Sequence, residues 1–137
     1  MTASSTESYV LLDTSVLIDA EKLDLSDYEN CAFVISAVTV GELAFGLDTG
    51  SDPTARRARL RRVISDYEVL PFGVEEAKLY GVLATLVRAA GRNPRPRRLD
   101  LQIAATAAAA RVRLLTTNVD DFHGVDQLVD VVDVSGR

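Results

Sequence analysis

Cysteine and histidine are almost absent from this 137-residue sequence, which has one of each. The single cysteine, Cys31, excludes a disulfide within the chain and fits a reducing compartment. No basic residue stands beside Cys31 to activate its thiol, so we expect a small buried hydrophobic side chain. Cys31 and His123 together are too few to supply the ligands of a zinc site.

Long apolar runs are also missing, and none approaches the roughly 20 residues of a membrane span. Residues 1–8 are polar, with no basic residue and no apolar stretch, so we expect a flexible tail rather than a signal peptide. Residues 9–137 are enough for a single domain with its own core, without visible repeat or linker. These features predict a cytoplasmic protein with no membrane contact, although they do not exclude secretion.

Positive charge is in deficit, with 15 lysines and arginines against 20 acids and a net charge of -5. A deficit argues against nucleic-acid binding, which usually shows a basic surface. However, ten of the 15 basic residues are arginines in two clusters, at 56–62 and 88–98. Each cluster is either a solvated face or a rim that contacts phosphates. The residues most suited to phosphate contact are Arg56, Arg57, Arg95, Arg97 and Arg98.

Strand and helix patterns alternate along the chain. We predict strands at about 10–12, 32–35, 68–70, 113–116 and 129–134, and helices at about 15–22, 38–47, 53–67, 74–90 and 101–111, with a loop at 93–98. Asp52 and Pro53 open the third helix as N-cap and first residue, and its apolar stripe is Leu60, Val63, Ile64 and Tyr67. This alternation predicts an α/β/α domain, with a mostly parallel central sheet of four to five strands flanked by helices.

Acidic residues stand at the ends of four predicted elements. Asp13 ends the first strand, Glu42 lies in the helix after the second, and Asp100 begins the alanine-rich helix. Asp121, with Asp120 beside it, follows the fourth strand. In a parallel sheet these positions share the edge where the strands end, which is where open α/β sheets bind ligands.

Each of these acids also has a purely structural explanation. Asp13 can cap the first helix, and Glu42 follows Thr39 at the spacing of a capping box. Asp100 can stabilise a helix dipole and Asp121 can hold a turn. Four carboxylates together, however, would repel one another unless a cation neutralised them. Oxygen ligands suit Mg²⁺, with Mn²⁺ as a substitute, and such sites are typical of phosphate chemistry.

At these residues the sequence resembles the PIN-domain ribonucleases, and among them the VapC-type toxins of bacterial toxin–antitoxin pairs. The matching segments occur in the order and with the spacing of that family. They are residues 12–18, residues 40–43 with Gly46, residues 100–107, and residues 115–118 followed by Asp121 and Phe122. The resemblance spans almost the whole chain, from about Val10 to Val134.

The resemblance implies a site made of catalytic, metal-binding acids and supporting polar residues. The acids are Asp13, Glu42, Asp100 and, as the fourth, Asp121, with Asp120 and Asn118 as alternatives for the fourth position. Asn118 is the reason for the alternatives, because it stands where family members have Asp or Asn. The supporting residues, expected to orient a ligand or the attacking water, are Thr14, Ser15, Thr116 and Asn118.

The resemblance also implies an activity and partners. It predicts a Mg²⁺-dependent endoribonuclease of bacterial or archaeal cytoplasm that leaves 5′-phosphate and 3′-hydroxyl ends, arrests growth, forms a homodimer and is inhibited by a VapB-type antitoxin. One alternative is a phosphatase or phosphoacceptor with Asp13 as nucleophile. It is disfavoured because position 15 is serine and neither Lys22 nor Lys78 ends a strand. Another is a catalytically silent PIN-like module that binds RNA or protein, for which we would expect missing acids.

Overall fold

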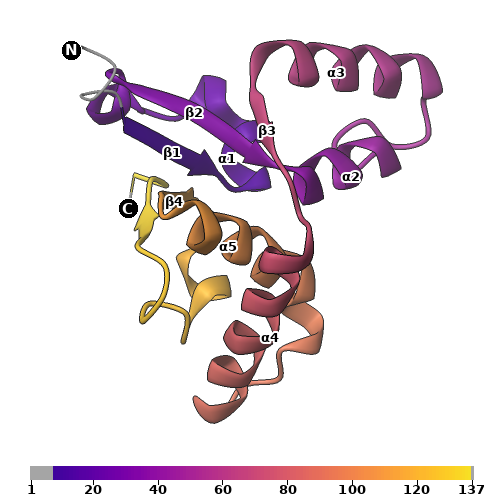
Figure 1. Cartoon of the computed structure of the whole chain (residues 1–137). Coiled ribbons are helices and arrows are strands. Elements are labelled where there is room, and N and C mark those ends of the chain that lie inside the picture. Colours follow the sequence, from indigo (N-terminus) through magenta and orange to yellow (C-terminus); the bar gives the residue numbers. More distant parts are fainter. Residues whose placement is uncertain (1–7, 137) are drawn as a thin grey trace.

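The strand that precedes Asp13 lies at the centre of the sheet in the computed structural model, which describes residues 8–136. The sheet has five strands in the order β3-β2-β1-β4-β5, and all four pairings are parallel (Figure 1). The strands are β1 (Ser8–Leu12), β2 (Cys31–Ser36), β3 (Glu68–Leu70), β4 (Arg113–Thr116) and β5 (Val131–Asp133). This arrangement confirms the predicted parallel α/β fold.

Helices cover both faces of the sheet. They are α1 (Thr14–Asp19), α2 (Ala37–Phe45), α3 (Pro53–Asp66), α4 (Val74–Ala89) and α5 (Arg98–Ala110). Short 3₁₀ turns are η2 (Ala20–Lys22), η3 (Ser26–Tyr28), η4 (Arg95–Arg97) and η5 (Val119–Phe122). Figure 1 shows α4 and α5 together on one side of the molecule and α3 on the other.

The central strand is apolar along its buried length because both of its faces are covered. Leu11 packs into one core with α4 and α5, whereas Val10 and Leu12 pack into a second core with α1 and α3. Helix α2 contributes to both cores, since Val38 near its start packs against the first and Leu43 near its end lies in the second. Helix α2 therefore crosses the edge of the sheet where the strands end.

The alanine-rich helix α5 lies close to its neighbours because Ala104, Ala105 and Ala107 are fully buried small side chains. A buried hydroxyl pair joins α5 to the end of β2, with 2.9 Å between Ser36 Oγ and Thr106 Oγ1. Thr106 donates its proton to the Gln102 carbonyl oxygen, so Ser36 must be the donor in this pair. This contact fixes the start of α2 relative to α5.

Several element predictions are confirmed and others need correction. Asp52 caps α3 by accepting from the N–H groups of its second and third residues, as the sequence predicts. The predicted apolar stripe of α3 is wrong at Ile64, which is 52% exposed. The predicted loop at 93–98 contains η4, and α5 begins at Arg98.

The predicted tail at residues 1–8 lies outside the described residues except for Ser8, which is the first residue of β1 and pairs with Cys31. Within residues 8–136, none of the helices combines the length and the apolar character that crossing a membrane requires.

Candidate active site

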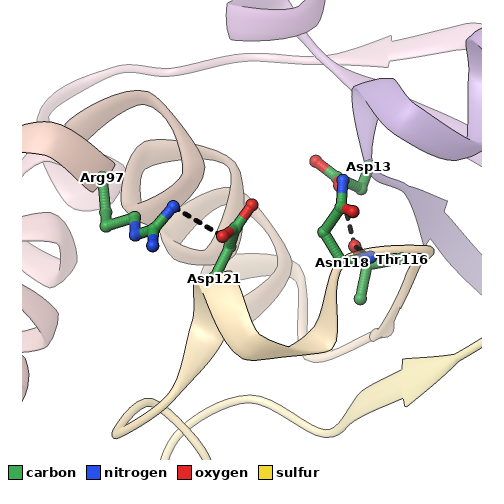
Figure 2. Close-up of polar contacts among 5 residues, drawn as sticks. All are labelled: Asp13, Arg97, Thr116, Asn118 and Asp121. Atoms are coloured by element: carbon green, nitrogen blue, oxygen red, sulfur yellow. Dashed lines mark hydrogen bonds and ion pairs between the residues drawn. The ribbon is translucent and has the colours of Figure 1, made fainter.

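The first acid, Asp13, follows β1 where that strand adjoins β4. Its backbone N–H donates to the Leu115 carbonyl oxygen at 2.9 Å, which continues the pairing of the two strands by one residue. Its side chain is held by two hydroxyl groups, since Ser15 Oγ and Thr116 Oγ1 each donate to Asp13 Oδ2 at 2.8 Å. Figure 2 shows Asp13 and Thr116 together at this end of the sheet.

The two hydroxyl groups orient the Asp13 carboxylate, which does not act as a helix cap. Asp13 occupies the N-cap position of α1, but its side chain makes no capping hydrogen bond. Burial raises the pKa of Asp13, and the hydrogen bonds from Ser15, Thr116 and the Thr14 N–H oppose that rise. The side chain is only 3% exposed. Both hydroxyls use Oδ2, so neither donates to Oδ1.

Thr116 and Asn118 shape the turn that follows β4. The Thr116 hydroxyl donates to Asp13 and accepts from the Asn118 backbone N–H at 2.9 Å (Figure 2). Its single proton is therefore already used to orient a carboxylate. Asn118 is exposed, and its carbonyl oxygen accepts from the Asp121 N–H at 2.9 Å. These bonds set the start of η5, which carries Asp120 and Asp121.

The second acid, Glu42, receives a hydrogen bond from a buried threonine pair. Thr14 Oγ1 donates to Glu42 Oε1 at 2.6 Å, and Thr14 Oγ1 lies 2.9 Å from Thr39 Oγ1. Since Thr14 has one proton and gives it to Glu42, Thr39 donates to Thr14. Burial raises the pKa of Glu42, the Asp13 charge raises it further, and the Thr14 hydroxyl lowers it.

The capping-box explanation of Glu42 is wrong. Helix α2 begins at Ala37, and its N-cap is Ser36, whose hydroxyl accepts from the Val38 N–H at 3.0 Å. Thr39 is thus inside the helix, and its hydroxyl serves the relay to Glu42. The sequence analysis did not identify Thr39 as part of the site.

The third acid, Asp100, lies in the first turn of α5, and its pKa is raised. Burial and the nearby charges of Asp13, Asp121 and Glu42 raise the pKa of Asp100 to about 7, against the opposing effect of Arg97. The other three acids predicted from the sequence therefore all act on the Asp100 carboxyl group. The structure brings them to one edge of the sheet, close enough to interact electrostatically.

The fourth acid, Asp121, is held by an arginine. Arg97 Nη1 lies 2.5 Å from Asp121 Oδ1, and the two side chains are 43% and 27% exposed (Figure 2). Arg97 ends η4, immediately before the helix that carries Asp100. Asp120 is exposed and makes no comparable contact among the residues described.

The donor set has the chemistry of a site for a hard divalent cation, because it is made of carboxylate oxygens that repel one another. The side chains do not form a complete metal site. Within residues 8–136, no group of three acidic, histidine or cysteine residues lies close enough together to hold an ion. Two of the acids are engaged elsewhere, Glu42 with Thr14 and Asp121 with Arg97. The residues fit such an ion in type, and a rearrangement of side chains would be needed to enclose it.

The predicted arginine rim is divided between two places. Arg56 and Arg57 lie on α3, where Arg56 donates to the Gly50 carbonyl oxygen and Arg57 is exposed. Arg95 and Arg98 are exposed on either side of Arg97, near the acids. The first pair therefore lies on α3 and the second lies at or just before the start of α5, and Figure 1 shows these two helices on opposite sides of the molecule.

An apolar groove lies beside Glu42 and was not predicted from the sequence. It has a volume of about 520 Å³ and is lined by Val38, Gly41, Glu42, Phe45, Leu47, Leu99 and Gln102. Phe45 is 84% exposed at its rim. The sequence shows an aromatic residue three positions after Glu42, but the exposure of Phe45 is evident only from the structure.

The sequence is similar to a known protein family and to individual members of it. The model of the PIN domain family matches residues 10–128. Ribonuclease VapC4 of Mycobacterium tuberculosis is 34% identical over 114 residues, which cover 80% of this chain and 86% of the relative. Ribonuclease VapC5 of the same organism is 32% identical over 133 residues, covering 93% and 96%.

Solved structures agree with the sequence relatives. VapBC-5 from Mycobacterium tuberculosis, a member of the VapBC family of toxin–antitoxin systems, superposes with a TM-score of 0.72 and 30% identity. The superposition covers 93% of this chain and 98% of that one. The likeness therefore extends over nearly the whole of both chains.

Proposed function

Because the chain belongs to the PIN domain family, and within it to the VapC ribonucleases, we propose that it is a divalent-metal-dependent endoribonuclease and the toxin of a type II toxin–antitoxin pair. The observation that carries this proposal is the electrostatic coupling of four carboxylates at one sheet edge. Burial and the negative charges of the other three acids raise the pKa of Asp100 to about 7. A divalent cation bound among these carboxylates would relieve their mutual repulsion.

The residues that would hold the ion are Asp13, Glu42, Asp100 and Asp121, with Mg²⁺ as the expected ion and Mn²⁺ as a substitute. When bound, such an ion activates a water molecule and stabilises the oxygens of an in-line displacement at phosphorus. Asp120 and Asn118 are weaker candidates for the fourth ligand. Asp120 is exposed, and the backbone of Asn118 forms the turn before η5.

The hydroxyl groups around the acids hold the carboxylates in place. Ser15 and Thr116 fix Asp13 Oδ2, and Thr39 acts through Thr14 on Glu42. Hydrogen bonds of this kind orient metal ligands and are expected to matter nearly as much as the ligands themselves. Asp100 with a pKa of about 7 holds a proton part of the time near neutral pH, and a bound cation would release it.

Partners follow from the same relationship. Arg95, Arg98 and Arg57 present exposed guanidinium groups that we expect to contact RNA phosphates. Since related chains occur in VapBC toxin–antitoxin systems, we expect a VapB-type antitoxin, a homodimer and action in the cytoplasm. The apolar groove beside Glu42 supports a protein partner, because exposed apolar grooves are typical of interaction surfaces.

The test is metal-dependent RNA cleavage by the purified chain and by Asp13→Asn and Asp100→Asn variants. We expect cleavage that requires Mg²⁺ or Mn²⁺ in the parent chain and is lost in both variants. Asp27→Asn removes an exposed acid of η3 outside the cluster and should leave cleavage unchanged. Circular dichroism would establish that the inactive variants are folded.

The outcome that contradicts the proposal is also specific. A parent chain that binds RNA but never cleaves it at any divalent-ion concentration would be a silent PIN-like module. Cleavage that persists in both Asp13→Asn and Asp100→Asn would exclude the acidic cluster as the catalytic site.

A further inference from the structure

Arg97 forms an ion pair with Asp121, the acid proposed above as the fourth metal ligand. Asp121 contributes to the charge that raises the pKa of Asp100, so it lies within electrostatic reach of the cluster. Its Oδ1 is nevertheless taken by Arg97 Nη1 at 2.5 Å. Figure 2 shows Asp121 facing Arg97, with Asp13 and Thr116 in a separate group.

We propose that Arg97 is a positioning residue that competes with the divalent cation for Asp121, so that the guanidinium neutralises this carboxylate until an ion replaces it. The inference rests on the proposed function, because it assumes that Asp121 is a ligand. It explains why Asp121 interacts electrostatically with Asp100 and yet, within residues 8–136, belongs to no group of three acids that could hold an ion.

The surroundings allow the two side chains to separate. Both line a cavity of about 250 Å³ together with Val87, Arg92, Asn93, Pro96, Asp120 and His123. The ion pair is therefore bordered by open space and is partly exposed. A pair in this setting is worth little free energy, so a cation held by several carboxylates can displace the guanidinium.

The competition also gives the arginine a second use. A guanidinium that leaves Asp121 stays on the wall of a cavity that already carries Arg92 and His123. Planar guanidinium groups bind phosphate oxygens well, so the freed Arg97 suits an RNA phosphate next to the acids. Metal binding would then favour RNA binding through a single side chain.

The experiment is a Mn²⁺ titration without RNA, followed by the paramagnetic resonance signal of the free ion. We expect Arg97→Gln to bind Mn²⁺ roughly three- to fivefold more tightly than the parent chain, the factor that a partly exposed ion pair is worth. Arg95→Gln is the matched control, because it removes the same charge two residues away from an exposed side chain. It should change the affinity much less.

Asp121→Asn decides whether the effect passes through the ion pair. Combined with Asp121→Asn, the Arg97→Gln change should bring no further gain in Mn²⁺ affinity. A merely structural role for Arg97 would instead weaken metal binding. Equal affinities in Arg97→Gln and Arg95→Gln, or a gain that survives in the double variant, would overturn the inference. A parent chain that binds no Mn²⁺ and cleaves no RNA would contradict the proposed function itself.

Discussion

The two ends of the acidic cluster are built differently. At the strand end, Asp13 is buried and receives two hydroxyl hydrogen bonds from Ser15 and Thr116. At the η5 end, Asp121 stands on a short 3₁₀ turn, and its side chain is more than a quarter exposed and paired with an arginine. The first carboxylate is held in one orientation, whereas the second can exchange partners. A site of this kind combines a rigid half that sets geometry with an adjustable half that responds to a ligand.

The strongest test of the difference between the rigid and the adjustable half is to remove one acid from each. We expect Asp13→Asn to lower the rate of RNA cleavage by on the order of 10³-fold or more, as removal of a central catalytic group does. Asp121→Asn should lower it by only about tenfold, since its loss leaves the preorganised half intact and also frees Arg97. Single-turnover cleavage at saturating Mn²⁺ measures both. Equal losses would mean that the two halves do not differ in importance.

The hydroxyl groups offer a smaller test of the rigid half. Thr116→Val keeps the shape of the side chain but removes the donor to Asp13 Oδ2, so we expect a loss of about 10- to 100-fold in metal affinity or activity. Thr85→Val is the matched control, because the exposed Thr85 hydroxyl donates only to a carbonyl oxygen of its own helix. If both valine variants behave alike, the hydroxyl of Thr116 does not orient the acid.

The hydrogen bond from Thr14 to Glu42 can be tested in the same way. Thr14→Val removes the hydrogen bond that lowers the pKa of Glu42, so that pKa should rise further. We expect activity to fall about tenfold. The pH–rate profile should also move to higher pH, because Glu42 with a higher pKa loses its proton only in more alkaline solution. A pH–rate profile checks this. An unshifted profile would show that Glu42 does not titrate in the reaction.

The smallest expected effect is on stability. Asp100 has a pKa of about 7 when folded against an ordinary value of 3.8, so the folded protein binds its proton more readily than the unfolded chain does. The free energy of unfolding of the metal-free protein should therefore fall as pH rises between these values, and stay low above them. Asp100→Asn removes this penalty and should raise the melting temperature above about pH 7 relative to the parent chain.

Thermal melts at about pH 5 and about pH 8 in the presence of a chelator measure this difference. Asp27→Asn serves as the control, since Asp27 is exposed on η3 and should not alter the pH dependence. A larger stabilisation of Asp100→Asn at the acidic pH would contradict the direction of the shift.

The fold and the position of the candidate site could be predicted because they depend on local patterns. The apolar runs that form β1 and β4 are bounded by polar residues, and parallel strands carry Asp13 and Thr116 to the same edge. The capping of α3 by Asp52 could likewise be predicted from the sequence, because the N-cap residue and the proline that follows it are adjacent.

The partners of the site residues could not be predicted, because they depend on side chains that are distant in sequence. Thr116 and Asp13 are 103 residues apart, Thr14 and Glu42 are 28 apart, and Arg97 is 24 residues from Asp121. The spacing of Thr39 and Glu42 suggested a local cap, but packing of α2 across the sheet edge gave Thr39 a different contact. Tertiary packing decided these cases.

The crossing of α2 between the two cores has a consequence for how the domain opens. Val38 packs on one side of the sheet and Leu43 on the other, so neither core can come apart without disturbing the same helix. The amide protons in the middle of α2 should therefore exchange with solvent mainly when the whole domain unfolds. Glu42 sits on that slowly exchanging segment, and so this acid would be presented to a ligand by the part of the molecule that opens last.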